Sequence, residues 1–241
     1  AWAKALGHKI IPPRPALVPV TTNDAWVGQL KGVTIPDVGV RVIDPIEAGR
    51  ARLQPSQVLA QTRGSFLLTH FGLSGPAVLD ISRAITAHAS PNTLLLECDF
   101  LPGENREPLQ QRLAEHLQSN GGKQLSNAHL EEIPVRLWIA LLAQADIDAN
   151  TRAAELSKDA RRRLLDALKS TRIRISGTRG FKKAEVTAGG VDLGDVNSST
   201  MESKLVPGLY FAGEILDLDG PIGGYNFQAA FSTGWLAGEG V

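Results

Sequence analysis

The chain has 241 residues, of which 43% are hydrophobic, so it can bury a sizeable core in one large domain or two small ones. Lysine plus arginine and aspartate plus glutamate each number 25, and the resulting zero net charge does not favour a nucleic acid as a partner. Cys98 is the only cysteine, which excludes an intrachain disulfide, and no apolar run reaches the length of a membrane span. We therefore expect a cytoplasmic protein with no membrane partner.

The amino-terminal part of the chain predicts a helix end followed by short strands. Gly7 stands where a cap would end a helix over residues 1–6. Residues 8–15 are rich in proline, which is unfit for a helix interior. From residue 16 to about residue 60, alternating valines such as those at 38–42 predict strands, and glycine and proline punctuate them. Short strands at this spacing predict an antiparallel sheet or a small barrel.

The next segments continue the sheet and then interrupt it with helices. Residues 66–69 and 93–98 predict strands, and Pro76 fits the first position of a helix between them. Between residues 104 and 170, leucines and other apolar residues recur at helical spacing, as at 109, 113 and 117, which predicts three or four helices. Strands return from residue 171, so the helical part is expected to be an insertion into the sheet.

The carboxyl-terminal segment carries the pattern with the clearest chemical meaning. Residues 209–211 predict a short buried strand that ends at Ala212-Gly213-Glu214, and a glycine-rich loop over residues 220–224 leads into a final helix. In flavoproteins with two dinucleotide-binding halves, such a glycine lets the backbone approach the ribityl-phosphate side of FAD, and the acid accepts a ribityl hydroxyl. The N–H groups and the positive end of the helix favour the negative charge of a reduced flavin. Either piece alone is more simply a strand end or a turn, whereas the two together predict contact with FAD.

The sequence resembles the carboxyl-terminal part of the BaiN-type, aminoacetone-oxidase-like flavoproteins, over nearly its whole length. The matching stretches are residues 6–8, 15–19, 30–33, 69–77, 186–191, 200–204 and 208–234. The last of them is the most specific.

The resemblance implies an α+β fold: an antiparallel β-barrel with an inserted helical subdomain, plus the C-terminal portion of a split Rossmann-like FAD-binding domain. The implied parts are residues 1–14 as the end of an FAD-domain segment, 15–103 as the first part of the barrel, 104–170 as the helical insert, 171–190 as the return of the barrel and 191–241 as the carboxyl-terminal FAD-domain segment. It also implies an FAD-dependent oxidoreductase, with FAD as cofactor and a small-molecule substrate that enters between the flavin and the inserted parts. Family members have been linked to amine oxidation and to reduction of unsaturated steroids, and no residue here selects between these substrates.

The resemblance also implies the residues of the site. The residues expected to contact the flavin are Gly213, Glu214, Gly223, Gly224, Tyr225, Asn226 and Phe227. Thr187, Gly189 and Gly190 form a Thr-x-Gly-Gly turn, and fumarate reductases place a similar turn at the flavin, so these residues are expected to line the flavin or the substrate.

One feature of the family pattern does not occur in this sequence. Relatives begin with a strand, a Gly-x-Gly-x-x-Gly turn and a helix that bind the ADP half of FAD, and this glycine fingerprint is absent here. We expect the chain to be a fragment, or to have a partner that supplies the amino-terminal half, and to be inactive alone. The alternative is a non-catalytic interaction module made of the barrel and the helical part.

The remaining sequence patterns concern His70, a hydrolase motif, metal binding and nucleic-acid binding. His70, in the stretch 69–76, is either part of a tight turn or a proton donor or acceptor on the substrate side of the flavin. The same stretch is not a hydrolase nucleophile elbow, because Pro76 occupies a position that needs glycine. No two histidines have ligand spacing, so no metal site is expected. A nucleic-acid-binding barrel is disfavoured by the zero net charge and the lack of a basic or aromatic stripe.

Overall fold

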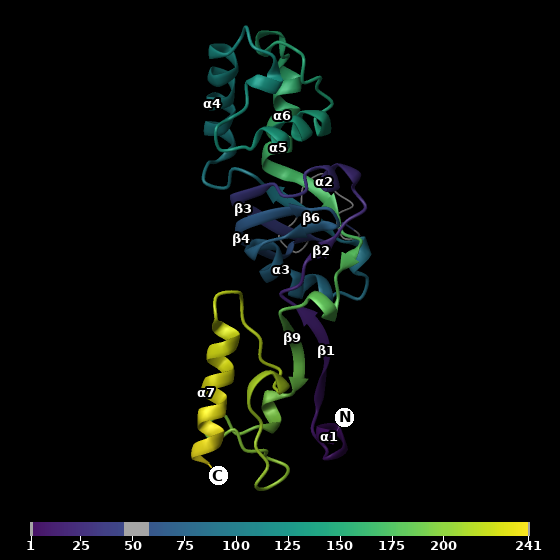
Figure 1. Cartoon of the computed structure of the whole chain (residues 1–241), viewed down its shortest axis with the longest axis vertical. Helices are drawn as coiled ribbons and strands as arrows, with labels where there is room; N and C mark the ends of the chain where they lie inside the picture. Colours follow the sequence, from purple (N-terminus) through teal and green to yellow (C-terminus); the bar gives the residue numbers. More distant parts are fainter. Residues whose placement is uncertain (1, 46–57, 241) are drawn as a thin grey trace.

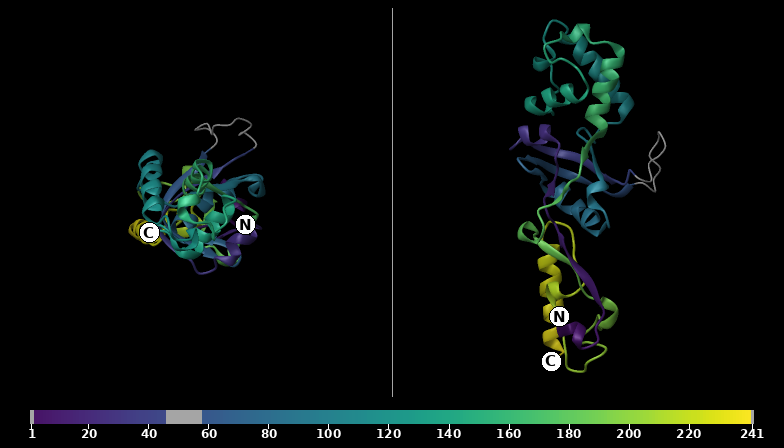
Figure 2. Two further views of the ribbon diagram at one scale, coloured as in Figure 1. Left: turned by 90° about the horizontal axis from the view of Figure 1, so that it is seen from above. Right: turned by 90° about the vertical axis from the view of Figure 1, so that its right-hand side faces the viewer.

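The chain forms three parts stacked along one long axis (Figure 1). A helical part lies at one end, a sheet lies in the middle, and a two-stranded ribbon leads to a carboxyl-terminal segment at the other end, where both termini also lie. Seen along the long axis, the three parts overlap one another (Figure 2). This computed structural model describes residues 2–45 and 58–240. Residues 46–57, which belong to the stretch expected to form strands, lie outside the described residues.

The middle part is a sheet in which the described residues form seven strands in the order β7-β6-β3-β4-β5-β2-β8. Their bounds are β2 (Val20–Thr21), β3 (Thr34–Ile43), β4 (Val58–Thr69), β5 (Gly72–Ser74), β6 (Leu95–Asp99), β7 (Thr171–Arg174) and β8 (Gly177–Thr178). All neighbouring strands are antiparallel. The predicted antiparallel sheet is therefore confirmed.

The two edges of this sheet are joined by one run of chain, which gives the sheet a barrel-like form. After β7, the N–H of Ile175 donates to Leu94 beside β6, and the N–H of Ser176 donates to Thr21 of β2. The chain thus passes from one edge to the other within a few residues. Among the described residues β7 and β8 do not pair with each other, so the ladder is not a closed barrel.

Among the described residues, two α-helices cover the sheet and three others form the inserted part. The helices on the sheet are α2 (Ala25–Gln29) and α3 (Pro76–Ala87). α3 begins at Pro76, as predicted, and buries Val78, Ile81 and Ile85. The inserted helices are α4 (Arg106–Ser119), α5 (Val135–Gln144) and α6 (Lys158–Ser170), and they lie between the paired strands β6 and β7. Together with the sheet they confirm the expected α+β class.

The middle and helical parts share one continuous apolar core. It runs from the sheet residues Val40 and Phe66 to Leu164 and Leu168 of α6. Trp138 of α5 is fully buried in it, and its Nε1 donates to the carbonyl of Leu125 at 2.7 Å. The buried ring therefore keeps its one polar group satisfied.

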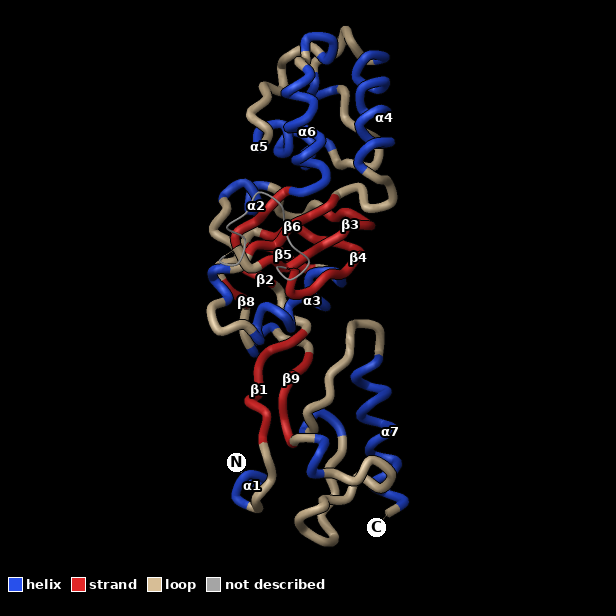
Figure 3. Tube along the Cα trace, turned by 180° about the vertical axis from the view of Figure 1, so that it is seen from behind, coloured by secondary structure: helices blue, strands red, loops and turns tan. Residues whose placement is uncertain are grey.

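The third part begins with a short helix and a two-stranded ribbon. Helix α1 (Trp2–Ala5) leads to β1 (Ile10–Ala16), which pairs antiparallel with β9 (Val186–Val191). Figure 3 shows this ribbon extending from the sheet toward the carboxyl-terminal segment. His8, buried between the ribbon and that segment, lies 2.7 Å from Ser203 Oγ through its Nε2.

The carboxyl-terminal segment has little regular structure before its final helix, α7 (Tyr225–Glu239). The strand expected over residues 209–211 is not formed, because Tyr210 makes one isolated bridge to Glu202 and no described strand lies beside it to extend a ladder. One isolated parallel bridge joins Val191 and Leu216, but the described residues form no parallel sheet. The Rossmann-like domain therefore stays a prediction.

Candidate functional site

A cavity of about 500 Å³ lies where the start of β9 meets the carboxyl-terminal segment. Its lining consists of Leu17, Glu185, Val186, Gly213, Glu214, Leu218, Pro221, Ile222, Gly223, Gly224, Asn226, Phe227, Ala229 and Ala230. Most of these residues are apolar or glycine, and a few are polar. A cavity of this size and character is typical of a site for a small molecule or cofactor.

The start of α7 presents free backbone donors to this cavity. Gly224 is the N-cap residue, in the left-handed region with φ +93°, and it offers no side chain to the helix. Within the described residues, the N–H groups of residues 223–227 donate no hydrogen bond. A Cβ added at Gly224 would meet no atom within 4 Å, so the missing side chain leaves open space beside these donors. Free N–H groups at the positive end of a helix favour an anionic or electron-rich ligand.

Other side chains hold the glycine-rich loop in place. Asn226 makes two hydrogen bonds with Gly220. Its Oδ1 accepts from the Gly220 N–H at 2.9 Å, and its Nδ2 donates to the Gly220 carbonyl at 3.0 Å. Asp80 of α3 accepts from the N–H of Ile222 at 2.7 Å. Arg83 of the same helix pairs with Asp219 at 3.1 Å. The loop is thus preformed, because the middle part and the loop itself both fix its backbone.

Glu214 links the carboxyl-terminal segment to the ribbon. Its Oε1 accepts a hydrogen bond from the backbone N–H of Thr187 on β9 at 2.7 Å. The residue is exposed to the cavity, so its second carboxylate oxygen remains available to a ligand hydroxyl. The preceding Gly213 has φ +72°, and its N–H donates to Thr233 Oγ1 at 2.9 Å. This contact fixes the turn that carries the carboxylate.

The structure brings most of the expected flavin-contacting residues into one place. The expected residues in the cavity lining are Gly213, Glu214, Gly223, Gly224, Asn226 and Phe227. Thr187 reaches the site through its backbone, as the donor to Glu214. Tyr225 does not line the cavity and is 61% exposed beside the loop. Both polar side-chain atoms of Asn226 are engaged with Gly220, so this residue holds the loop rather than offering a free donor.

The two glycines of the Thr-x-Gly-Gly turn are not in the cavity lining. A Cβ at Gly189 would lie 2.5 Å from the carbonyl oxygen of Pro12, and one at Gly190 would lie 2.4 Å from that of Ile215. Both glycines thus permit close backbone packing of β9 against its neighbours. Their expected contact with a flavin or a substrate stays a prediction, and the described packing explains why glycine stands there.

His70 also lies outside the cavity lining. It is exposed in the turn between β4 and β5, and its ring meets Phe71 edge-on at 5.0 Å. Within the described residues it makes no side-chain hydrogen bond. The structure therefore gives no support for its proposed role as a proton donor or acceptor in this cavity.

Sequence reasoning missed several lining residues. Those missed are Leu17, Glu185, Val186, Leu218, Pro221, Ile222, Ala229 and Ala230. Most stand next to expected residues in the sequence, and that proximity was a usable signal. Leu17 had no such signal, because it reaches the cavity only through the fold. Its φ of +48° is unusual for a residue with a side chain.

The described residues contain no group of three or more histidine, cysteine, aspartate or glutamate side chains that could hold a metal ion. Burial in the sheet raises the pKa of the Cys98 thiol well above its ordinary range, so this residue is not a nucleophile. None of the helices in the described ranges is long and apolar enough to cross a membrane.

The fold and the cavity define an α+β protein with a barrel-like sheet, a helical insertion and a ligand-sized pocket in its carboxyl-terminal segment. Residues 14–186 match the model of the HI0933-like protein barrel and H2TH domain, so the chain belongs to the HI0933-like family.

Curated relatives match almost the whole chain. It is 33% identical to the ribosomal RNA dihydrouridine synthase of Escherichia coli, over 98% of this chain and 54% of that protein. It is 35% identical to the 3-dehydro-bile acid delta(4,6)-reductase of Clostridium scindens, over 99% of this chain and 56% of the relative. It is also 35% identical to the ribosomal RNA dihydrouridine synthase of Haemophilus influenzae, over 97% of this chain and 53% of the relative. The chain thus spans about half the length of the curated relatives it matches.

Proposed function

We propose that the chain is part of an FAD-dependent reductase, and that it holds the ring and ribityl side of the flavin in the cavity at the start of α7. The observation that carries this proposal is that Gly223, Gly224, Asn226 and Phe227, whose N–H groups donate no hydrogen bond within the described residues, line a cavity of about 500 Å³ together with Glu214. The relatives support the class of reaction, because one of them is named a reductase.

The residues present fit the flavin in two respects. First, Gly223 and Gly224 leave the loop without side chains where a flat ring would lie, and the N–H groups behind them would stabilise negative charge on that ring. Second, Glu214 offers a carboxylate oxygen to a ribityl hydroxyl while Thr187 holds its other oxygen. These groups bind and orient the cofactor, and the apolar lining excludes water from it.

The names of the relatives share one kind of chemistry. A dihydrouridine synthase saturates the carbon–carbon double bond of uridine next to a carbonyl, and a delta(4,6)-reductase acting on a 3-dehydro acid saturates double bonds conjugated to a carbonyl. We therefore propose an α,β-unsaturated carbonyl as the substrate class. When bound, a reduced flavin would supply the two electrons as a hydride for the carbon β to the carbonyl, and the proton for the α carbon would come from solvent.

The ADP half of FAD needs a second set of residues. The 241 residues contain no Gly-x-Gly-x-x-Gly turn, and the relatives are about twice as long as this chain. We propose that polypeptide outside these residues binds the ADP half. The test is to titrate FAD and follow flavin fluorescence, first with this chain alone and then with any coding sequence upstream of Ala1 included. Binding that requires the longer polypeptide supports the proposal, and no binding in either form would refute it.

A pair of matched variants makes this titration specific to the site. Glu214→Ala removes a charged acceptor, so FAD affinity should fall about tenfold or more. Glu131→Ala, on an exposed residue of the helical part that makes no described side-chain hydrogen bond, should leave the affinity unchanged. Equal effects of the two variants would remove Glu214 from the flavin site.

A non-catalytic interaction module is the second candidate. The observation that favours it is the exposed aromatic row on α7, formed by Phe227, Phe231 and Trp235. Such a row suits a protein partner. Under the leading proposal the polypeptide that binds the ADP half would cover it. A glycine fingerprint upstream of Ala1 supports the reductase, and its absence there supports the module.

A further inference from the structure

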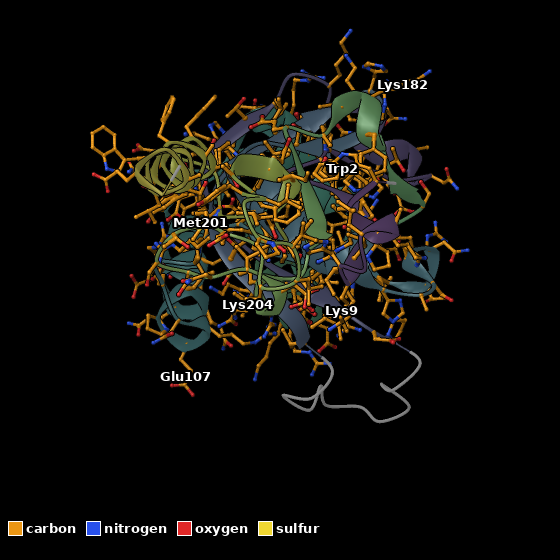
Figure 4. The ribbon with its side chains drawn as sticks, turned by 90° about the horizontal axis from the view of Figure 1, so that it is seen from below. Trp2, Lys9, Glu107, Lys182, Met201 and Lys204 are labelled. Carbon is orange, nitrogen blue, oxygen red and sulfur yellow. The ribbon has the colours of Figure 1, made fainter. Side chains whose placement is uncertain are left out.

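A basic turn with an exposed aromatic ring comes shortly before the cavity-lining residues Glu185 and Val186 in the chain. It consists of Arg179, Phe181, Lys182 and Lys183, all exposed, and it includes a short 3-10 turn over Phe181–Lys183. Lys182 lies at the outer edge of the molecule in Figure 4. We call these four residues the basic turn.

The backbone of the basic turn is anchored on both sides. The N–H of Arg179 donates to Pro19 at 3.0 Å, and the N–H of Glu185 donates to Leu17 at 3.2 Å. Between them, the N–H groups of Lys183 and Ala184 both donate to the carbonyl of Gly180. The turn is thus held in one shape, so its side chains project from a fixed base.

The cations of the basic turn have no acidic partner among the described residues. No ion pair there includes Arg179, Lys182 or Lys183, whereas Arg172 and Arg174 on β7 are paired with Glu97 and Asp24. Arg179 instead lies over the ring of Phe71, 4.5 Å from its centroid. Three unneutralised cations within five residues make a local positive site that the zero net charge of the whole chain conceals.

Phe181 adds a second kind of contact. Its ring is 57% exposed and stands between the cations in sequence. Exposed aromatic rings beside cations are the groups on which single-stranded nucleic acids stack their bases while their phosphates are neutralised. A protein partner would be served by an apolar patch, and the basic turn offers one ring among charges, so its chemistry favours a single-stranded nucleic acid. The two relatives named ribosomal RNA dihydrouridine synthases make RNA the nucleic acid proposed.

The location connects the basic turn to the reaction site. Glu185 and Val186 line the cavity, and Val186 follows Lys183 by three residues. Three extended residues span at most about 10 Å, so a strand held at Lys183 lies within one or two nucleotides of the cavity mouth. An enzyme that acts on a base needs such a grip, because the base must leave its stack to enter the pocket.

We propose that the basic turn binds the backbone of a single-stranded RNA and presents one of its bases to the cavity. This inference rests on the proposed function and adds to it the surface that selects an RNA substrate over a small unsaturated carbonyl compound. It replaces our expectation from net charge that no nucleic acid is a partner, which no finding has tested. Arg179, Lys182 and Lys183 contact phosphates, and Phe181 stacks on a base.

The test measures binding of a fluorescein-labelled, uridine-containing single-stranded RNA of about 16 nucleotides by fluorescence anisotropy. The double variant Lys182→Ala/Lys183→Ala should weaken binding about tenfold and reduce the slope of log affinity against log salt by about 1.4, since each phosphate contact contributes about 0.7. Phe181→Ala should weaken binding about fivefold or more with little change in that slope. The matched control is Lys123→Ala/Lys158→Ala, which removes two exposed, unpaired lysines from the helical part and should have no effect.

The outcomes separate this inference from the proposed function. No RNA binding by the unaltered protein, or equal losses in the two double variants, would overturn the RNA surface. FAD titrations on the same samples test the flavin site, so loss of RNA binding with unchanged FAD affinity supports the basic turn by itself. Circular dichroism melting curves that match across the variants exclude misfolding.

Discussion

The two ends of the molecule bury their apolar residues to very different degrees. The sheet and the helical part share one continuous core, in which α6 buries Leu164, Leu165 and Leu168. At the other end, α7 buries Thr233 and leaves four aromatic residues exposed: Tyr225, Phe227, Phe231 and Trp235. The buried cluster there is small, built around Phe211 and Leu216.

The two ends are therefore stabilised in different ways. The core shared by the sheet and the helical part is enclosed among the described residues, because its apolar side chains are buried there. The row on α7 repeats every four residues, which is the spacing of one helix face that normally packs on a neighbour. The carboxyl-terminal segment therefore has a sequence suited to a further layer, and it is also where the ligand cavity lies.

Substitution of Trp138 and of Trp235 should show the difference in burial between the two ends most strongly. Trp138→Ala should lower the free energy of unfolding by about 3–5 kcal/mol, because the ring is fully buried and the substitution leaves a cavity. Trp235→Ala removes a ring that is 70% exposed, and the expected change is within about 0.5 kcal/mol. Urea unfolding followed by circular dichroism measures both. Similar losses in the two variants would mean that α7 is packed in solution and that the two ends do not differ in burial.

Two glycines test how the carboxyl-terminal segment is joined to the ribbon. Gly190→Ala forces a Cβ to within 2.4 Å of the Ile215 carbonyl, so we expect a loss of about 2–3 kcal/mol. Gly208→Ala places a side chain in open space at φ +73°, where conformational strain alone costs about 1 kcal/mol. Thermal unfolding of both variants gives the difference. An equal cost would mean that β9 can move away from Ile215, and that the ribbon does not fix the cavity wall.

The amount that could be predicted from sequence differs between the same regions. The helices of the inserted part were predictable because Leu109, Leu113 and Leu117 repeat with helical spacing and are all buried. Pro76 marked the start of α3 for the same kind of local reason. The strand expected over residues 209–211 was wrong, because a strand needs a neighbour and the described residues supply one bridge.

The candidate site was predictable only where its residues are close in sequence. Glu214 and the loop over residues 220–224 form one local pattern, so they could be found together. The contact of Glu214 with Thr187 could not, since it depends on how β9 lies against the carboxyl-terminal segment. Leu17 and the basic turn are brought to the cavity by strand pairing between distant segments, which a zero net charge and local spacing do not reveal.

The amino-terminal ends of α6 and α7 also differ, and the expected effect on the free energy of unfolding is smaller. Ser157 caps α6, since its Oγ accepts from the N–H of Ala160 at 3.2 Å, whereas α7 begins at Gly224 with no side-chain cap. Ser157→Ala should cost about 1 kcal/mol of unfolding free energy. Ser157→Asp keeps an acceptor and should restore most of the loss. Urea unfolding checks both, and an alanine variant as stable as the unaltered chain would mean that α6 does not depend on its cap.

The smallest effect on stability is expected for the ion pair between Lys9 and Asp192. Its Nζ and Oδ2 atoms lie 2.5 Å apart, and the pair links the start of the ribbon to the carboxyl-terminal segment. The hydrogen bond from Lys9 lowers the pKa of Asp192 below its ordinary value of 3.8, and the same bond raises the pKa of Lys9 above 10.5. A lowered carboxyl pKa stabilises the fold above 3.8, and this stabilisation is lost as the pH falls through the folded value. A raised lysine pKa stabilises the fold below 10.5 and is lost as the pH rises through the folded value.

Asp192→Asn should therefore lower the melting temperature slightly at neutral pH, and the difference from the unaltered chain should shrink as the pH falls through the folded pKa of Asp192, because the carboxylate is then protonated in both states. Asparagine retains an oxygen for the Gly194 N–H, so the effect isolates the charge. Lys9 is exposed and Asp192 is half-buried, so high salt should also reduce the difference. A difference that persists at low pH or in high salt would mean that Asp192 acts through the shape of its turn. The start of the ribbon and the carboxyl-terminal segment would then be joined by local structure and not by charge.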